Sequence, residues 1–312
     1  MRKSLGIRNW ESAQKIVRDM EARVHGDSVS VKDAFERFIT ARAGKGLRSE
    51  SLGKYRLLER ELVREFGSRP VDAVRVDDLA RYREGWKLAA ISARKKIERL
   101  RSFFKFCLSR GWVERNPASE LDMPALKFSP TLPVTDTDLE NLLAACDRFP
   151  NKGIYGERTG ARIKTFLLVL RYAGLRIRDC VMLKRDSLSD GRIFIYAQKT
   201  GVPVYVPIPD FVVAELQKWG GEYFFWSGAG LAKSAVADWQ RSLSRLGKFA
   251  GISFHPHQLR NSFALSLLKN GVGLETVAIL LGNSVKIAER HYSAFVPARQ
   301  AVLEEAVKRT FA

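Results

Sequence analysis

The sequence has no hydrophobic run long enough to cross a membrane. Its longest apolar segments, such as FLLVL at residues 166–170, are far shorter than the roughly 20 residues of a membrane-spanning helix. The N-terminal segment MRKSLGIRNW carries positive charges with no apolar stretch behind them, unlike a signal peptide. We therefore expect a soluble, cytoplasmic protein without a membrane partner.

Cysteine is also scarce. Cys107, Cys146 and Cys180 are far apart in the sequence and form no CxxC pair, which fits neither a disulfide framework nor a zinc site. We expect each of them to be a buried core residue, with no metal bound through these thiols.

Acidic residues are too few to balance the basic ones. The 312-residue chain has 53 Lys and Arg against 34 Asp and Glu, which gives a net charge of +19. The excess occurs in both halves, with 28 against 17 in residues 1–120 and 25 against 17 in residues 121–312. This balance favours a polyanionic partner that contacts both halves, through release of counterions from its phosphates. Charge alone leaves DNA, RNA, an anionic membrane and a merely solvated basic surface open.

Helical spacing dominates the first 120 residues. Apolar residues recur at positions i, i+3, i+4 in four segments, which cover residues 13–20, 30–44, 52–67 and 92–109. Ser30 and Asp33 form a possible capping pair at the start of the second segment. The fourth segment is expected to bury Leu108 and to present a basic side toward the polyanion, made of Arg94, Lys95, Lys96, Arg99 and Lys105.

Four prolines interrupt the chain in NPASELDMPALKFSPTLP, residues 116–133. We therefore predict an extension at 1–26, a helical domain at 27–118, a linker at 119–133 and a second domain at 134–312. In the second domain, GRIFIYAQKTGVPVYVPIP at 191–209 predicts a hairpin with Lys199 near its tip. Helices are predicted at 136–145, 163–170, 235–249, 257–269 and 274–281. The expected fold class is mainly α, with a small antiparallel sheet in a mostly helical second domain.

Three stretches of the second domain carry residues suited to phosphate chemistry. His257 and Arg260, in HPHQLRNSFA, are three residues apart at a helix start, where the helix N-terminus favours an anion. Arg176, in AGLRIRD, follows a glycine helix stop, and its planar guanidinium can grip two oxygens of one phosphodiester. Lys199, in QKTGVPVYVP, can hand a proton to a leaving alkoxide.

Together with LLGNSVKIAERHY at 280–292, these stretches resemble the motifs of the tyrosine recombinase family, also called phage integrases. The family's first arginine motif is similar to GLRIRD, and its HxLRxxxA motif is similar to HQLRNSFA. Its nucleophile motif, LGH followed nine residues later by Tyr, is similar to the segment from Leu281 to Tyr292. Residues 27–118 also resemble the family's helical core-binding domain. Asn283 stands where the family usually has His or Trp.

The resemblance implies a site-specific DNA recombinase without a metal or other cofactor. Tyr292, whose sequence neighbours are polar, would attack a DNA phosphodiester to give a 3′-phosphotyrosyl enzyme and a free 5′-hydroxyl. Arg176 and Arg260 would neutralise the phosphate, and Asp179 would orient Arg176. His257 would act as a base or donate a hydrogen bond to the phosphate, and Lys199 would protonate the leaving oxygen. Asn283 would donate a neutral hydrogen bond.

The implied partners are double-stranded recombination sites, further copies of the chain in a tetramer on DNA, and accessory DNA-bending proteins. The two domains would form a C-shaped clamp on the duplex. Integration or excision of a mobile element, or a similar rearrangement, would be the outcome.

Simpler interpretations remain for single residues. Tyr292 alone would be a packing residue, and the histidines of HPH would hint at a metal without acidic or cysteine partners at ligand spacing. Arg176 would form a surface salt bridge with Asp179. Lys184 is a second candidate for the catalytic lysine beside Lys199. Asn283 would cap a helix after Gly282. For the whole protein, the alternatives are a type IB topoisomerase-like enzyme that reseals the same strand and a relative that binds DNA without cutting it.

Overall fold

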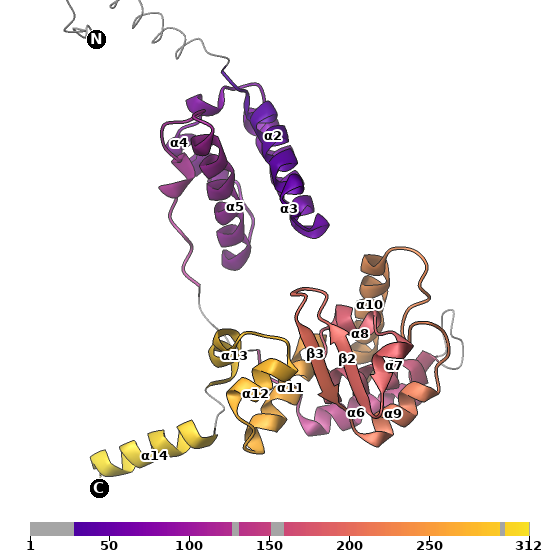
Figure 1. Cartoon of the computed structure of the whole chain (residues 1–312). Helices are drawn as coiled ribbons and strands as arrows, with labels where there is room; N and C mark the ends of the chain where they lie inside the picture. The colour runs from indigo at the N-terminus through magenta and orange to yellow at the C-terminus, as the bar shows by residue number, and fades with distance from the viewer. Residues whose placement is uncertain (1–27, 127–130, 151–158, 294–296, 312) are drawn as a thin grey trace, which may run out of the picture. The chain divides into compact units, whose positions relative to one another are not determined.

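Helices dominate the described part of the chain (Figure 1), and two hydrophobic cores organise it. The computed structural model describes residues 28–126, 131–150, 159–293 and 297–311. The chain divides into two units, residues 1–128 and 129–312, and the division falls inside the segment expected to be a linker. The expected N-terminal helix within residues 1–26 lies outside the described residues.

The first unit packs its helices around stacked aromatic rings. Its helices are α2 (Val31–Gly44), α3 (Ser49–Phe66), α4 (Val76–Glu84) and α5 (Ala90–Ser109), with short 3-10 turns η1 (Val71–Ala73) and η2 (Pro117–Ser119). The rings of Phe35 and Phe103 stack with centroids 4.1 Å apart, and Phe38 meets both of them edge-on. This pairing joins α2 to α5.

The predicted start of α2 is confirmed, because the Ser30 hydroxyl accepts from the Asp33 backbone N–H at 3.1 Å and donates to the Asp33 carboxylate at 2.7 Å. Leu108 was predicted to be buried, and this is wrong: its side chain is 41% exposed at the last turn of α5. Cys107 takes the buried position there instead.

The second unit is mostly helical, with one small sheet. Its helices are α6 (Asp136–Asp147), α7 (Thr159–Tyr172), α8 (Ile177–Val181), α9 (Asp210–Gln217), α10 (Ala232–Ala250), α11 (Pro256–Lys269), α12 (Leu274–Leu280), α13 (Val285–Tyr292) and α14 (Pro297–Phe311). The sheet has the antiparallel order β1 (Leu188–Ser189), β2 (Arg192–Tyr196), β3 (Pro203–Pro207), and it follows the 3-10 turn η4 (Arg185–Ser187). The predicted mainly α fold with a small antiparallel sheet is confirmed.

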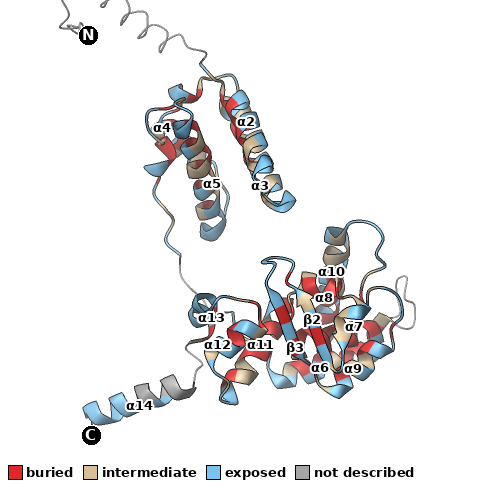
Figure 2. Cartoon of the chain, viewed as in Figure 1, coloured by how far each residue is buried: buried red, intermediate tan, exposed pale blue. Residues whose placement is uncertain are grey.

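The hairpin of β2 and β3 has one buried and one exposed side (Figure 2). Ile193, Val204 and Val206 point into the core, while Phe194 and its cross-strand partner Tyr205 lie on the exposed side. This alternation is the period of two that a sheet covered on one side requires. Helix α12 contacts β3, and α11 and α13 both contact α12, so α12 connects the hairpin to the helices that precede and follow it in the sequence.

Helix α7 is the centre of the second core. Most of its length is buried, and Phe166 stacks on Trp239 of α10 at 4.0 Å. The three cysteines are free and buried as predicted, and burial raises the pKa of Cys107 and Cys146 to about 12. Among the described helices, none is both long and apolar enough to cross a membrane.

Candidate active site around Tyr292

Arg260 is a deeply buried cation at the centre of the site. It lies on the first turns of α11 and is only 2% exposed. Its Nη1 donates to the Gly174 carbonyl at 2.7 Å, and its Nη2 donates to the Leu281 carbonyl at 2.6 Å. Burial and the nearby Arg176 charge lower the pKa of Arg260 to about 10, so it stays charged at neutral pH. Its buried Nε has no hydrogen-bond partner among the residues that the structure describes.

Two glycine turns bring the other polar groups to Arg260. Gly174 follows α7 with φ 61°, and Gly282 follows α12 with φ 56°, which is the left-handed region that glycine tolerates best. A Cβ at Gly282 would lie 2.6 Å from Val204 of β3, and a Cβ at Gly174 would collide with the Phe263 ring. Both turns therefore need glycine for conformation and for space.

Arg176 meets Asn283 across these turns. Its Nη2 donates to the Asn283 Oδ1 atom at 2.6 Å, and its Nη1 lies 3.8 Å from the Asp179 carboxylate. Asp179 is buried and accepts from the Gln198 backbone N–H at 2.8 Å, so it connects Arg176 to the turn that carries Lys199. The structure thus brings Arg176, Asp179 and Asn283 together.

Asn283 differs in one respect from the expected phosphate donor. Its side-chain oxygen holds Arg176, and its backbone N–H donates to the Ala278 carbonyl at 3.0 Å at the end of α12. The residue therefore ends the helix with its backbone and positions an arginine with its side chain.

Tyr292 is the last residue of α13, and its hydroxyl donates to the Asn261 Oδ1 atom at 2.8 Å. Its sequence neighbours are polar, but Tyr292 itself is only 5% exposed. Ala288 and Tyr292, four residues apart, form the buried side of α13. Burial raises the pKa of Tyr292, while the charges of Arg260 and Arg176 act in the opposite direction. Tyr292 is thus within electrostatic reach of both arginines.

His257 lies at an exposed position near the start of α11. Partial removal of its imidazole from water, followed by the charges of Arg260, His255, Arg176 and His291, lowers the pKa of His257 to about 4. These influences place His257 in the same cluster as the two arginines. A neutral imidazole at pH 7 can accept a proton.

Lys199 is exposed in the turn between β2 and β3. The turn is closed by the Ala197 N–H to Val202 carbonyl bond at 2.9 Å and the Gly201 N–H to Ala197 carbonyl bond at 2.7 Å. Its competitor Lys184 is held by Glu222 at 2.8 Å, which raises the pKa of Lys184. A more tightly held proton makes Lys184 a poorer general acid than an ordinary lysine.

Asn261, His255 and His291 are neighbours of the site that we did not predict to be site residues. Asn261 follows His257 and Arg260 at the spacing i, i+3, i+4, and this pattern was the available signal for it. His255 caps α11 by accepting from the His257 N–H at 3.2 Å, and the His291 ring lies 6.2 Å from the Tyr292 ring.

The basic side of α5 is only partly available to a partner. Lys95 and Lys105 are exposed, whereas Lys96 binds Glu61 at 2.5 Å and lies over the rings of Tyr82 and Trp86. Lys96 was expected to point outward, but its side chain is 13% exposed. It packs inside its own unit. Arg94 lies 3.6 Å from Glu98, and Arg99 is half-buried.

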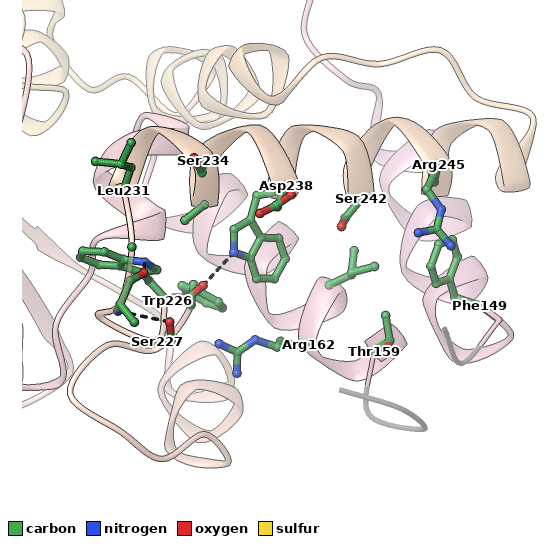
Figure 3. Close-up of a pocket in the computed structure, with 16 residues that line it drawn as sticks. Phe149, Thr159, Arg162, Trp226, Ser227, Leu231, Ser234, Asp238, Ser242 and Arg245 are labelled. Atoms are coloured by element: carbon green, nitrogen blue, oxygen red, sulfur yellow. Dashed lines mark hydrogen bonds between the residues drawn. The ribbon is translucent and has the colours of Figure 1, made fainter. Parts of the chain in front are cut away.

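A cavity of about 450 Å³ lies between α7, α10 and the segment around Trp226, apart from this site (Figure 3). Trp239 forms part of its wall and donates to the Phe225 carbonyl at 2.8 Å. Its lining contains Arg162 and Arg245 but none of the candidate catalytic residues. The candidate catalytic residues therefore lie outside this cavity.

Comparison with known proteins identifies the class. The family model described as the phage integrase family matches residues 134–295, which include all four motifs. The chain is 28% identical to tyrosine recombinase XerD of Pseudomonas aeruginosa over 272 residues, covering 82% of each chain. It is also 28% identical to XerD of Rhizobium meliloti over 278 residues, covering 82% of this chain and 88% of that one.

Solved structures show the same fold. A lambda integrase dimer bound to a COC′ core site has a TM-score of 0.71 at 19% identity, with coverage of 88% of this chain and 80% of that chain. A lambda integrase tetramer bound to a Holliday junction has a TM-score of 0.69 at 19% identity, with 90% of both chains covered. The chain belongs to the phage integrase family, as its motifs predicted. It is a tyrosine site-specific recombinase.

Proposed function

We propose that this recombinase cuts and rejoins double-stranded DNA through a covalent 3′-phosphotyrosyl intermediate on Tyr292. The observation that carries the proposal is the convergence of one tyrosine and two arginines from different segments. Tyr292 donates to Asn261, the residue after Arg260 on α11, and Arg260 donates to the Gly174 and Leu281 carbonyls of the two turns that hold Arg176 and Asn283. Such an arrangement favours negative charge on a phosphate held between the cations and on the tyrosine oxygen that attacks it.

Each residue has a step in this proposal. The Tyr292 oxygen attacks phosphorus, neutral His257 accepts the phenolic proton, and the bond to the 5′-oxygen breaks. Lys199 protonates that leaving oxygen, while Arg176, oriented by Asp179 and Asn283, and Arg260 neutralise the phosphate. One ester replaces another, so the reverse attack by a 5′-hydroxyl reseals the strand without an external energy source. Attack by a 5′-hydroxyl from a second duplex gives strand exchange.

The assembly that we propose is a tetramer on two recombination sites, with each chain clamping the duplex between its two domains. The lambda integrase structures, a dimer on a core site and a tetramer on a Holliday junction, support self-association on DNA. The exposed cations Lys95 and Lys105, with Arg94 and Arg99, would contact the DNA backbone. Accessory DNA-bending proteins would assist. The reaction would be integration or excision of a mobile element, or a similar rearrangement, carried out in the cytoplasm.

Covalent capture tests the proposal and needs no defined target site. The full chain is incubated with a randomised pool of nicked duplexes, protein-linked DNA is recovered under denaturing conditions, and the DNA is sequenced. We expect an enriched sequence linked to Tyr292. Binding without any linked DNA would indicate a relative that does not cut. A two-site assay on the enriched sequence then separates recombination from topoisomerase-like resealing, which relaxes supercoils without exchanging strands.

A further inference from the structure

Three side chains of α11 hold residues 131–134, where the predicted linker (119–133) meets the second domain. Gln258, Asn261 and Ser262 donate to the backbone carbonyls of Leu132, Thr131 and Val134 at 2.9, 2.9 and 2.8 Å. Their spacing of i, i+3, i+4 places them along one side of the helix. The first described residues of the second unit are therefore fixed to the same helix that carries His257 and Arg260.

Both polar atoms of the Asn261 side-chain amide form hydrogen bonds. Its Nδ2 donates to the Thr131 carbonyl at 2.9 Å, and its Oδ1 accepts from the Tyr292 hydroxyl at 2.8 Å. Both Asn261 and Tyr292 are more than nine-tenths buried, so water does not easily replace either bond. One side chain thus connects the linker to the proposed nucleophile.

The hydroxyl bond to Asn261 opposes attack on phosphorus. In this arrangement Tyr292 gives its proton to an amide oxygen and stays in a buried position. To transfer its proton to His257 and direct a lone pair at a phosphate, the hydroxyl has to leave Asn261. Asn261 therefore has to release the tyrosine before the first chemical step.

We propose that Asn261 is a positioning residue that makes release of Tyr292 depend on the conformation of the linker at Thr131. Displacement of Thr131 removes the acceptor of Nδ2, and a buried amide with an unmatched donor is unfavourable. The amide then reorients toward another acceptor, and its oxygen no longer holds the hydroxyl. A linker that changes conformation when both domains bind DNA would free the tyrosine at that moment.

The coupling between the linker and Tyr292 must act in both directions, so it can be tested without DNA and without an activity measurement. If linker release favours tyrosine release, loss of the tyrosine bond must loosen the linker to the same degree. Tyr292→Phe removes one oxygen atom and keeps the ring. In the DNA-free full chain, we expect it to raise the rate of proteinase K cutting at residues 129–134 about fivefold, the factor for one buried neutral hydrogen bond.

Tyr172→Phe is the matched control, because Tyr172 is half-buried in the same unit and packs on Phe211 rather than on the linker. It should leave linker cutting unchanged. In the reverse direction, Asn261→Ala should raise nitration of Tyr292 by tetranitromethane, measured by peptide mass spectrometry. Equal linker cutting in wild type and Tyr292→Phe overturns the proposal. Unchanged nitration in Asn261→Ala does the same.

The consequence for strand cleavage rests on the proposed function. With duplexes from the covalent capture, Asn261→Ala should increase the single-turnover rate of adduct formation about fivefold, whereas a purely structural role predicts a decrease. If wild type forms no adduct with any duplex but Tyr292→Phe loosens the linker, the proposed function fails and the coupling stands. If adducts form but linker cutting does not respond, the coupling fails and the proposed function stands.

Discussion

Asn283 accepts a hydrogen bond from Arg176 at 2.6 Å, so the residue at the usual His or Trp position of the family holds a cation here. An amide oxygen can fix the guanidinium without neutralising its charge. Asn283 therefore sets the orientation of Arg176, from α12 and the turn after it, without placing a further negative charge beside the guanidinium.

From this contact we expect Asn283→Ala to lower single-turnover cleavage about tenfold, which corresponds to about 1.4 kcal/mol of transition-state stabilisation. Asn283→His restores a polar partner at this position and should keep or raise the rate. Quench-flow measurement of adduct formation on a captured duplex checks both. An unchanged rate in Asn283→Ala would leave the residue only its backbone role at the end of α12.

Substitution of Gly282 should lower the free energy of unfolding more than substitution of a glycine with ordinary backbone geometry. Gly282→Ala forces a Cβ into the left-handed region and against Val204, and we expect a loss of about 2–3 kcal/mol in the free energy of unfolding. Gly273→Ala is the control, because Gly273 has φ −61° and a Cβ there meets no atom within 4 Å. Urea unfolding of both variants should show the loss only for Gly282→Ala. Equal stabilities would contradict the strain at this turn.

His257 should make the protein less stable in mild acid. Its folded pKa of about 4 lies below the unfolded value of 6.5, so the unfolded chain binds more protons between these values. The contribution of His257 to the free energy of unfolding should therefore fall as the pH drops from about 6.5 to about 4. Comparison with His257→Gln, by denaturant titration at each pH, isolates this contribution. Parallel pH profiles for the two proteins would show that His257 has an ordinary pKa.

The C-terminal helix should serve assembly more than catalysis. Ala306, Val307 and Thr310 share one side of α14 at helical spacing, and all three are exposed, as is Phe311. Apolar side chains that are exposed to water along one helix are suited to contact with a neighbouring protomer. Removal of residues 299–312 should reduce pairing of two DNA sites in a gel-shift assay more than cleavage at one site. Equal losses in both assays would indicate that the helix packs on its own domain.

The sequence predicted the parts of the site that depend on local spacing. Residues that are close in the sequence determine the helix start at His257 and the hairpin around Lys199. The number of residues between Leu281 and Tyr292 is likewise a local feature of the sequence. The short helices α4, α8 and α9 were not predicted, because five to nine residues give too little apolar periodicity.

Contacts between distant segments could not be predicted. The burial of Tyr292 against Asn261 joins α13 to α11, and the pairing of Lys96 with Glu61 joins α5 to α3. For Lys96 the residue type alone favours exposure, and for Tyr292 it indicates only partial burial. In both cases the partner that makes full burial acceptable comes from tertiary packing. The same limit applies to the Arg176–Asn283 bond, whose two residues are brought together by the turns at Gly174 and Gly282.

Covalent attachment of DNA to Tyr292 is the central claim, and one comparison tests it most directly. Wild type and Tyr292→Phe are incubated with the same pool of nicked duplexes, and protein-linked DNA is measured after denaturation, with duplex binding measured in parallel. Because the substitution removes only the hydroxyl, we expect binding to stay nearly intact and linked DNA to disappear in Tyr292→Phe. Linked DNA that persists at the wild-type level in Tyr292→Phe would contradict the assignment of Tyr292 as the nucleophile.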